Sequence, residues 1–275
     1  MAAPSPFPNL LPGEDGFGQT RHEGDLLATI QNGGKMKVLK VCVAVLLFSC
    51  VFARGSAFAA CSNLTVTGIW GFQVGASVGQ ITSDGKGNIT AGSMTTNSQG
   101  VVSTTSFTGT YSVATNCTGS VTLSVAGAGT ETVNFVLDSG NKNFQIISTN
   151  PNTTAAGQAF PEGTVTCGLS GKKATFAQTL LGKINSTEPI AYVSQVILDG
   201  KGNVSGKGTF AVNGGFSTAS ITGTYTEGSN CTGTITMTPA GSTTIHLDFV
   251  VVNAGKGLLL LETDTTAAVA GVMLQ

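Results

Sequence analysis

The pentapeptide Asp-Gly-Lys-Gly-Asn occurs twice, at residues 84–88 and 199–203, and it is the first candidate for a metal or phosphate site. A calcium loop of this general form needs oxygen ligands at its first, third and fifth positions. The third position is Lys86 or Lys201, a cation where a ligand oxygen is required. A phosphate-binding loop needs Ser or Thr directly after Gly-Lys, and Gly follows here. The motif therefore argues against both kinds of site.

The same five residues are typical of a tight turn. An Asp can cap its own turn, Gly adopts positive φ without strain, and Asn tolerates the left-handed region. We therefore expect a hairpin turn in each copy, with no metal or cofactor bound there. The predicted turn residues are Asp84, Gly85, Gly87, Asn88, Asp199, Gly200, Gly202 and Asn203.

Nucleophilic catalysis needs a hydroxyl or thiol beside a base, and the chain offers few bases. Downstream of residue 59 the one imidazole is that of His246, and Asp248 follows two residues later. Residues two apart share one face of a strand, so these two side chains can form a pair on the outer face. The first copy of the repeat described below has Thr132 and Asn134 at these positions. We therefore predict no catalytic residue and a non-enzymatic protein.

The sequence also lacks the residues needed for a zinc site, for glycoside hydrolysis or for nucleic-acid binding. One His and four Cys expected in disulfides do not make a zinc site. Most carboxylates fall in predicted turns, and the pair Glu262 and Asp264 is replaced by Ser148 and Asn150 in the first copy, which argues against glycoside hydrolysis. Without Arg downstream of residue 59 and with a formal net charge of −1, the chain is not expected to bind nucleic acid.

The N-terminal part carries the features of a secretory signal peptide. Two Lys after Met36 form a basic region, residues 41–53 are apolar, and Ala57-Phe58-Ala59 supplies small residues at the −3 and −1 positions. We predict a signal peptide at 36–59 and a secreted, periplasmic or cell-envelope location. Lipid attachment at Cys61 is the alternative.

The two flanks of this segment lead to further predictions. Residues 1–35 are expected to be a non-native extension, because a Pro- and Gly-rich stretch does not normally precede a signal peptide. The apolar run is shorter than the about 20 residues that span a bilayer. We therefore expect no transmembrane span in the mature chain.

The rest of the chain is two copies of one unit. Residues 107–123 match 221–237, and the spacing between the copies is 114 residues there and 115 residues at the pentapeptide. The copies define a first unit at 60–163 and a second unit at 164–275. Two copies indicate a tandem duplication rather than an open solenoid.

Within each unit apolar and polar residues alternate with a period of two, as in residues 107–113, and Gly/Asn/Asp-rich breaks separate the runs. This pattern is typical of antiparallel strands joined by hairpins. Eight such runs can be counted in the second unit. We predict an all-β fold of two tandem antiparallel meander units, each a small eight-stranded up-and-down barrel. The alternative is one system of sandwich-like sheets.

The four Cys of residues 60–275 are expected to form disulfides, as is usual for an even number in an exported chain. Four Cys allow three pairings. The duplication favours Cys61 with Cys117 and Cys167 with Cys231, because each unit then carries its own cross-link.

The segments "CSNLTVTGIWGFQV", "DGKGN", "TGTYSVATNCTGSVTL" and "TGTYTEGSNCTGTITM" resemble a group of uncharacterised secreted β-repeat proteins of environmental bacteria. The resemblance extends over nearly all of residues 61–275. The second unit differs at its start, where "CGLSGKKATF" replaces the segment that contains Trp70. The resemblance implies a secreted bacterial protein and brings no established activity.

Two hypotheses for function remain, and they imply different partners. The first is an exported non-enzymatic component of the cell envelope or adhesion module with a cell-surface partner, because a charged fraction of 10% suits contacts that do not depend on charge. The second is a lipocalin-like carrier, because eight-stranded barrels can hold one small apolar ligand. An open apolar interior would favour the carrier, whereas two filled interiors would favour the first hypothesis.

Overall fold

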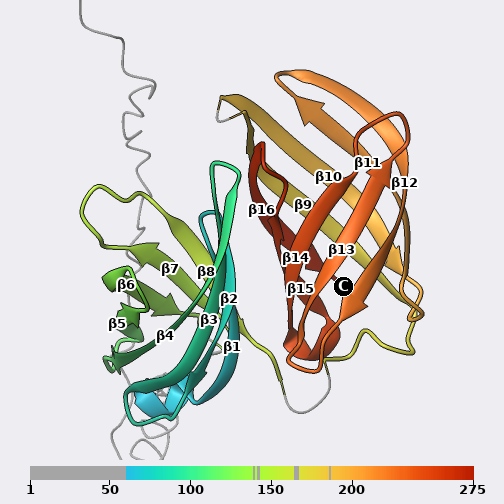
Figure 1. The fold of residues 1–275 in the computed structure, drawn as a ribbon. Helices are drawn as coiled ribbons and strands as arrows, with labels where there is room; N and C mark the ends of the chain where they lie inside the picture. The colour runs from blue at the N-terminus through green and yellow to red at the C-terminus, as the bar shows by residue number, and fades with distance from the viewer. Residues whose placement is uncertain (1–59, 139, 141–142, 164–166, 186) are drawn as a thin grey trace, which may run out of the picture. The chain divides into compact units, whose positions relative to one another are not determined.

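The computed structural model describes residues 60–275 except 139, 141–142, 164–166 and 186 (Figure 1). The predicted extension at 1–35 and the predicted signal peptide at 36–59 lie outside the described residues. The described residues belong to one compact unit that contains both copies of the repeat.

The first copy folds into eight antiparallel strands that close into a barrel, because β1 pairs with β8 as well as with β2. A short 3₁₀ helix, η1 (Asn63–Val66), precedes them. The strands are β1 (Gly68–Val74), β2 (Ser77–Ser83), β3 (Asn88–Ser98), β4 (Val101–Val113), β5 (Thr118–Val125), β6 (Gly129–Leu137), β7 (Phe144–Ser148) and β8 (Ala156–Pro161).

The second copy forms a second closed barrel, in which β16 returns to pair with β9. Its strands are β9 (Ala174–Ile184), β10 (Glu188–Leu198), β11 (Asn203–Val212), β12 (Gly215–Glu227), β13 (Thr232–Pro239), β14 (Ile245–Val252), β15 (Gly257–Glu262) and β16 (Ala267–Leu274), with η2 (Asn253–Gly255) before β15. The predicted all-β fold of two tandem eight-stranded barrels is confirmed. The alternative of sandwich-like sheets is wrong.

The period of two in the sequence separates the inside of each barrel from its outside. In β12, Ile221 and Tyr225 are buried, whereas Thr222 and Thr224 between them point outward. Hydroxyls on the outer faces also pair across strands, as Thr226 and Thr234 do at 2.9 Å. Such cross-strand pairs stabilise neighbouring strands without an apolar contact.

The second half of β14 and all of β15 depart from the predicted alternation, because both of their faces are buried there. Their outward side chains Val250, Val252, Leu259 and Leu261 pack against Val78 of β2. The alternating pattern predicts one solvent-exposed face for each strand. From Val250 on, the outer face of β14 is covered instead, which is why an apolar residue stands at this outward position, whereas His246 stays exposed.

The two pentapeptide turns have the same hydrogen bonds. One carboxylate oxygen of Asp84 accepts the backbone N–H of Lys86 (2.7 Å) and of Asn88 (3.0 Å), and the other accepts the Asn88 amide (2.6 Å). Asp199 repeats the pattern in the second copy. Hydrogen bonds from Asn88 hold the pKa of the Asp84 carboxyl at about 2. The carboxylate that a metal would need is therefore already used by the turn.

The two Gly of each turn adopt positive φ, with values of 73° at Gly85 and 107° at Gly87. The carbonyl of Gly87 accepts the backbone N–H of Tyr111, and Gly202 makes the same bond to Tyr225. The turn thus joins β2 to β3 and also fixes the end of β4.

A β-bulge explains why the copies are 115 residues apart at the turn and 114 residues apart later. The pairing of β3 with β4 shifts between Ile89 and Gly92, where the first barrel has one residue more on β3 than on β4. The second barrel pairs the same region without a shift, from Val204 to Gly206. The extra residue of the first copy therefore lies within this bulge.

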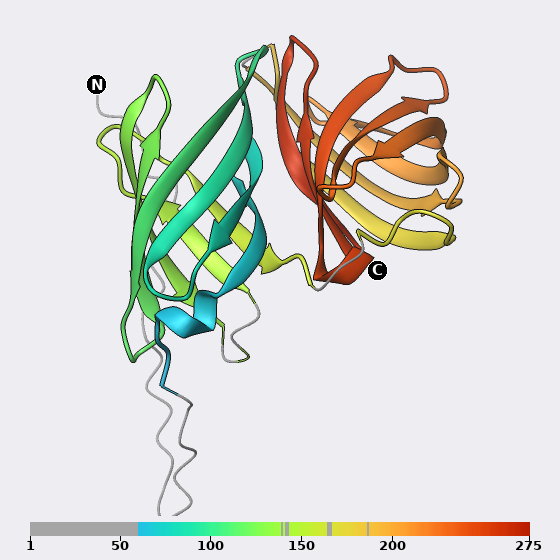
Figure 2. The same ribbon diagram turned by 60° about the horizontal axis from the view of Figure 1, so that its bottom comes forward.

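One end of each barrel is sealed by the segment that enters it. In the first barrel a disulfide joins Cys61 to Cys117, and Val66 of η1 is buried. The Tyr111 hydroxyl donates to the Asn63 carbonyl at 3.0 Å. Figure 2 shows η1 lying at this end of the barrel.

The second barrel repeats this arrangement with different residues. A disulfide joins Cys167 to Cys231, and Leu169 is buried. The Tyr225 hydroxyl donates to the backbone carbonyl of Leu169 at 3.3 Å. The pairing favoured by the duplication is thus the one present in the structure. Two disulfides indicate an oxidising compartment. Within the described part of the chain, no helix is long and apolar enough to cross a membrane.

Replacing Cys61 and Cys117 together by Ala should destabilise the first barrel. The cross-link closes a loop with a sequence separation of 56 residues. By the loop-entropy model its removal costs about 4 kcal/mol of unfolding free energy. Urea denaturation measures the loss. The control is the matched Cys167→Ala/Cys231→Ala variant, for which a similar loss is expected, and a loss below about 1 kcal/mol in both would contradict the model.

Candidate ligand-binding cavity

The order of the strands gives the first barrel two different ends. The sealed end holds η1, the disulfide and the turns β2–β3, β4–β5 and β6–β7. The opposite end, called the open end below, holds the connections β1–β2, β3–β4, β5–β6 and β7–β8. The pentapeptide turn lies at the sealed end.

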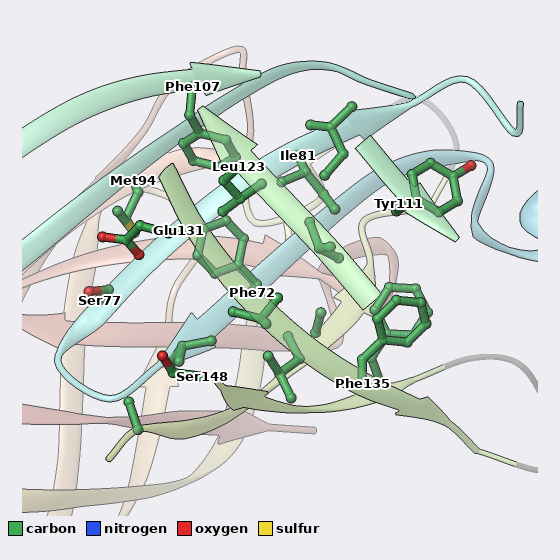
Figure 3. Close-up of a pocket in the computed structure, with 18 of the residues that line it drawn as sticks. Phe72, Ser77, Ile81, Met94, Phe107, Tyr111, Leu123, Glu131, Phe135 and Ser148 are labelled. Carbon is green, nitrogen blue, oxygen red and sulfur yellow. The ribbon is translucent and has the colours of Figure 1, made fainter. Parts of the chain in front are cut away.

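A cavity of about 230 Å³ occupies the interior of the first barrel (Figure 3). Its walls are mostly apolar and come from all eight strands and η1. The apolar side chains that line it are those of Val66, Phe72, Val74, Ile81, Ile89, Met94, Phe107, Val121, Leu123, Val133, Phe135, Phe144, Ile146, Ala155 and Ala159.

The cavity is closed at the sealed end and accessible at the open end. Near the sealed end Val66, Ile89, Phe135 and Phe144 are each at most 4% exposed. Phe144 stacks on Trp70, with ring centroids 4.1 Å apart, and closes the floor. A molecule can therefore enter only from the open end.

Polar side chains gather at the open end. Ser77, Thr96, Glu131, Ser148 and Thr153 line this part of the cavity, and all of them are partly or fully exposed. Figure 3 shows Ser77, Glu131 and Ser148 on one side of the cavity, with Tyr111 and Phe135 on the other. The cavity thus has an apolar floor and a polar rim.

The second barrel has the same fold but a filled interior. Its inward side chains form one continuous buried cluster. Members that are at most 2% exposed are Leu169, Phe176, Leu180, Val196, Leu198, Ile221, Ile235, Met237, Leu247, Phe249, Val251, Leu258, Leu260, Ala267, Val269 and Met273. The corresponding strands of the first barrel keep Ile81, Leu123 and Ile146 partly exposed around the cavity.

Strand register identifies the side chains that make this difference. Ser77 faces Thr96 across β2 and β3, and their hydroxyls hydrogen-bond at 2.9 Å. The equivalent pair in the second barrel is Tyr192 and Phe210, whose rings meet edge to face with centroids 4.9 Å apart. Two aromatic rings thus occupy the place of two small hydroxyl side chains.

At the strands β5, β6 and β8, too, polar or small residues of the first barrel are replaced by apolar or larger ones in the second. Glu131 pairs with Leu123, and the equivalent pair is Ile245 with Met237. Ala159, which pairs with Phe144, is replaced by the larger Met273. These substitutions remove polar groups from the rim and add apolar volume below it, whereas Phe72 and Met94 are replaced by the smaller Gln178 and Gly208.

The second barrel also has inward polar side chains, since Ser194 donates to the buried Gln178. Glu262 is another, because it brings a carboxyl to the position of Ser148. It is only 5% exposed, and its Oε2 has no hydrogen-bond partner among the described residues. Burial, with a smaller contribution from Asp264, raises the pKa of this carboxyl to about 7. The same burial, with Glu262 and Asp264 nearby, raises the pKa of Tyr192 to about 12.

The residues predicted from sequence as turn or disulfide residues lie outside the cavity lining. Both pentapeptide turns and all four Cys are at the sealed ends or in the segments that lead to them. Their role is to hold the barrel closed rather than to contact a ligand. In the described ranges, no group of three or more His, Cys, Asp or Glu is placed to hold a metal ion.

The pair of His246 with Asp248 that the sequence allows is not present in the structure. The His246 ring Nδ1 lies 2.7 Å from Oδ1 of Asp264, and the backbone N–H of His246 donates to the other oxygen of that carboxylate. Asp264 follows β15, the neighbouring strand, so the partner comes from across the sheet rather than along it. This pair is exposed on the outer surface, away from both barrel interiors.

The sequence also contains a feature that sequence analysis missed at Ser77. Residues 75–79 match the Gly-x-Ser-x-Gly pattern of hydrolase nucleophiles, which requires a turn from strand to helix. Here the segment forms the β1–β2 hairpin and the start of β2. The Ser77 hydroxyl bonds to Thr96 rather than to a His. Ser77 is therefore a rim residue of the cavity.

No protein-family model matches the chain, and no curated protein sequence matches it. The resemblance to secreted β-repeat proteins thus stays a prediction, and function has to be argued from the cavity itself.

The buried carboxyl of Glu262 predicts a dependence of stability on pH. Its pKa in the folded protein, about 7, lies above the ordinary 4.5, so folding binds a proton between these values. Stability should therefore fall as pH rises from about 4.5 to 7. Glu262→Gln should remove this part of the fall and stabilise the protein by up to about 3 kcal/mol at pH 8.

Urea denaturation of the parent and of Glu262→Gln at pH 4, 6 and 8 tests this. At pH 4 the two proteins should have the same stability, because the carboxyl is protonated in both the folded and the unfolded parent. Equal stability at pH 8 would show that the carboxyl is not shielded from water as the structure has it.

Proposed function

We propose that this protein is an exported, non-enzymatic protein that binds one small, mainly apolar molecule inside its first barrel. The second barrel has a structural role. The observation that carries the proposal is the difference between the two interiors. The same chain builds the same barrel twice, filling one with side chains and keeping a cavity of about 230 Å³ in the other.

The size of the cavity supports a compact ligand. An engineered cavity of about 150 Å³ lined by Leu, Ile and Phe binds benzene, and pockets for drug-sized ligands begin near 300 Å³. A volume of about 230 Å³ lies between these values. It suits a molecule with one or two rings, or a short branched chain.

The cost of an unfilled core supports the same conclusion. Apolar cavities destabilise a protein by roughly 24 cal/mol per Å³, which amounts to on the order of 5 kcal/mol for a cavity of this size. The second copy shows that filling side chains such as Tyr192 and Phe210 are compatible with the fold. A bound ligand that packs against the walls offsets part of the cost in the first barrel.

An envelope or adhesion role is the second hypothesis from the sequence, and it does not need the cavity. Phe216, at the start of β12, is 83% exposed and would suit a contact with another protein or a cell surface. The two functions respond differently to variants that fill the cavity, since these change no outer side chain.

Ligand binding is tested by titrating p-xylene while methyl NMR signals are recorded. Signals of Ile81, Leu123 and Ile146 should shift, because these side chains line the cavity. Methyl signals of Leu247 and Leu260 in the filled barrel should not. The variant Ser77→Tyr/Thr96→Phe places the aromatic pair of the second barrel in the first and should weaken binding by at least about tenfold, since the two rings take up ligand volume.

The matched control is the reverse change, Tyr192→Ser/Phe210→Thr, which should open a cavity in the second barrel. Methyl signals of that barrel should then respond to p-xylene. Shifts in both barrels of the parent protein, or in neither, would contradict the proposed function.

Export is tested by determining the N-terminus of the protein isolated from its native host. The proposed signal peptide at 36–59 predicts a mature chain that begins at Ala60, just before the disulfide-bonded Cys61. Intact-mass and N-terminal analysis measure this directly. A mature chain that keeps Met1, or one that begins with a lipid-modified Cys61, would contradict the proposed processing.

A further inference from the structure

The rim of the first barrel contains an unusual residue for an apolar cavity. Among the side chains that line the cavity, Glu131 is the one that carries a charge. It stands near the start of β6, at an inward position in line with Val133 and Phe135. Figure 3 shows its side chain among those that line the cavity, toward the same end as Ser77.

The described protein gives this carboxylate no cationic partner. No hydrogen bond or ion pair joins the side chain of Glu131 to another residue in the described part of the chain. The first unit has no Arg and two Lys. Lys86 is in the turn at the sealed end, and Lys142 is outside the described residues.

Several hydroxyl side chains line the cavity at the same end as Glu131. Ser77 and Thr96 are bonded to each other at 2.9 Å, and Ser148 lines the cavity at the same end. A hydroxyl has two acceptor lone pairs, so a hydroxyl that donates one hydrogen bond can still accept another. An ammonium group has three N–H donors and needs several acceptors of this kind.

We propose that the ligand of the first barrel is a compact apolar amine. Its protonated nitrogen binds Glu131 and the neighbouring hydroxyls at the open end, and its apolar part fills the cavity below. This inference rests on the proposed function and specifies the ligand class of the same cavity. A carboxylate ligand such as a fatty acid is disfavoured, because its charge would face Glu131, and no Lys or Arg among the described residues lines the cavity.

The second barrel supports the link between this charge and ligand binding. Where its interior is filled, the residue equivalent to Glu131 is Ile245, and Ser77 and Thr96 have become Tyr192 and Phe210. The carboxylate is therefore absent from the same barrel in which the space for a ligand is absent. A charge retained only to keep the open end soluble would not need to point into the cavity.

Three probes with the same ring and chain separate charge from apolar binding. They are 2-phenylethylamine, 2-phenylethanol and phenylacetate, titrated into the protein by calorimetry at neutral pH. A charge-assisted hydrogen bond is about twice as strong as a neutral one, so the amine should bind about ten times more tightly than the alcohol. Phenylacetate should bind more weakly than both.

Two variants locate the effect. Glu131→Gln keeps the size of the side chain and removes its charge, so it should lower the affinity for the amine about tenfold and leave that for the alcohol nearly unchanged. Glu131→Ile introduces the residue of the second barrel and should also remove the preference for the amine. The chemical shifts of Ile81 and Leu123 report whether each variant keeps the folded barrel.

The outcomes distinguish the binding of an amine by Glu131 from the more general binding of an apolar molecule in the first barrel. If the alcohol and phenylacetate bind as tightly as the amine, or if Glu131→Gln keeps the preference, the ligand is not an amine held by Glu131 and the proposed function still stands. If none of the three probes, nor p-xylene, binds the parent protein, the proposed function and this inference both fail.

Discussion

The structure depends on the closure of an eight-stranded sheet. Once β1 pairs with β8, every strand of the first barrel has two neighbours, and no sheet edge is left to pair with another chain. Strand number also limits the interior to a space that side chains can just fill. Whether such a barrel is solid or hollow is then decided by the volume of a few inward side chains.

The two barrels show both results within one chain. Their strands, their turns and the Tyr hydroxyl that anchors each sealed end are preserved, as Tyr111 and Tyr225 illustrate. The inward residues near the open ends are not preserved, since Ser77 and Thr96 stand where the other barrel has Tyr192 and Phe210. After duplication, the copies kept what holds the barrel closed and differ in what fills it.

The architecture could be predicted from the sequence because it depends on local signals. The period of two, the paired turns and the repeat each specify strands and their neighbours, and the barrels follow. The cavity could not be predicted in this way, because its volume depends on side chains from eight strands at one level. The same limit applies to His246, whose partner Asp264 is 18 residues away and lies just after the neighbouring strand. Only aligning Ser77 with Tyr192 by strand register would have indicated a hollow first barrel.

The sealed end makes the first barrel a cup rather than a tunnel. Because Trp70, Val66 and the Cys61–Cys117 disulfide close the sealed end, a molecule that enters at the open end has to leave by the open end as well. Loading and unloading cannot then take place at once from opposite sides. A donor and a recipient of the cargo would have to approach the same four hairpins, one after the other.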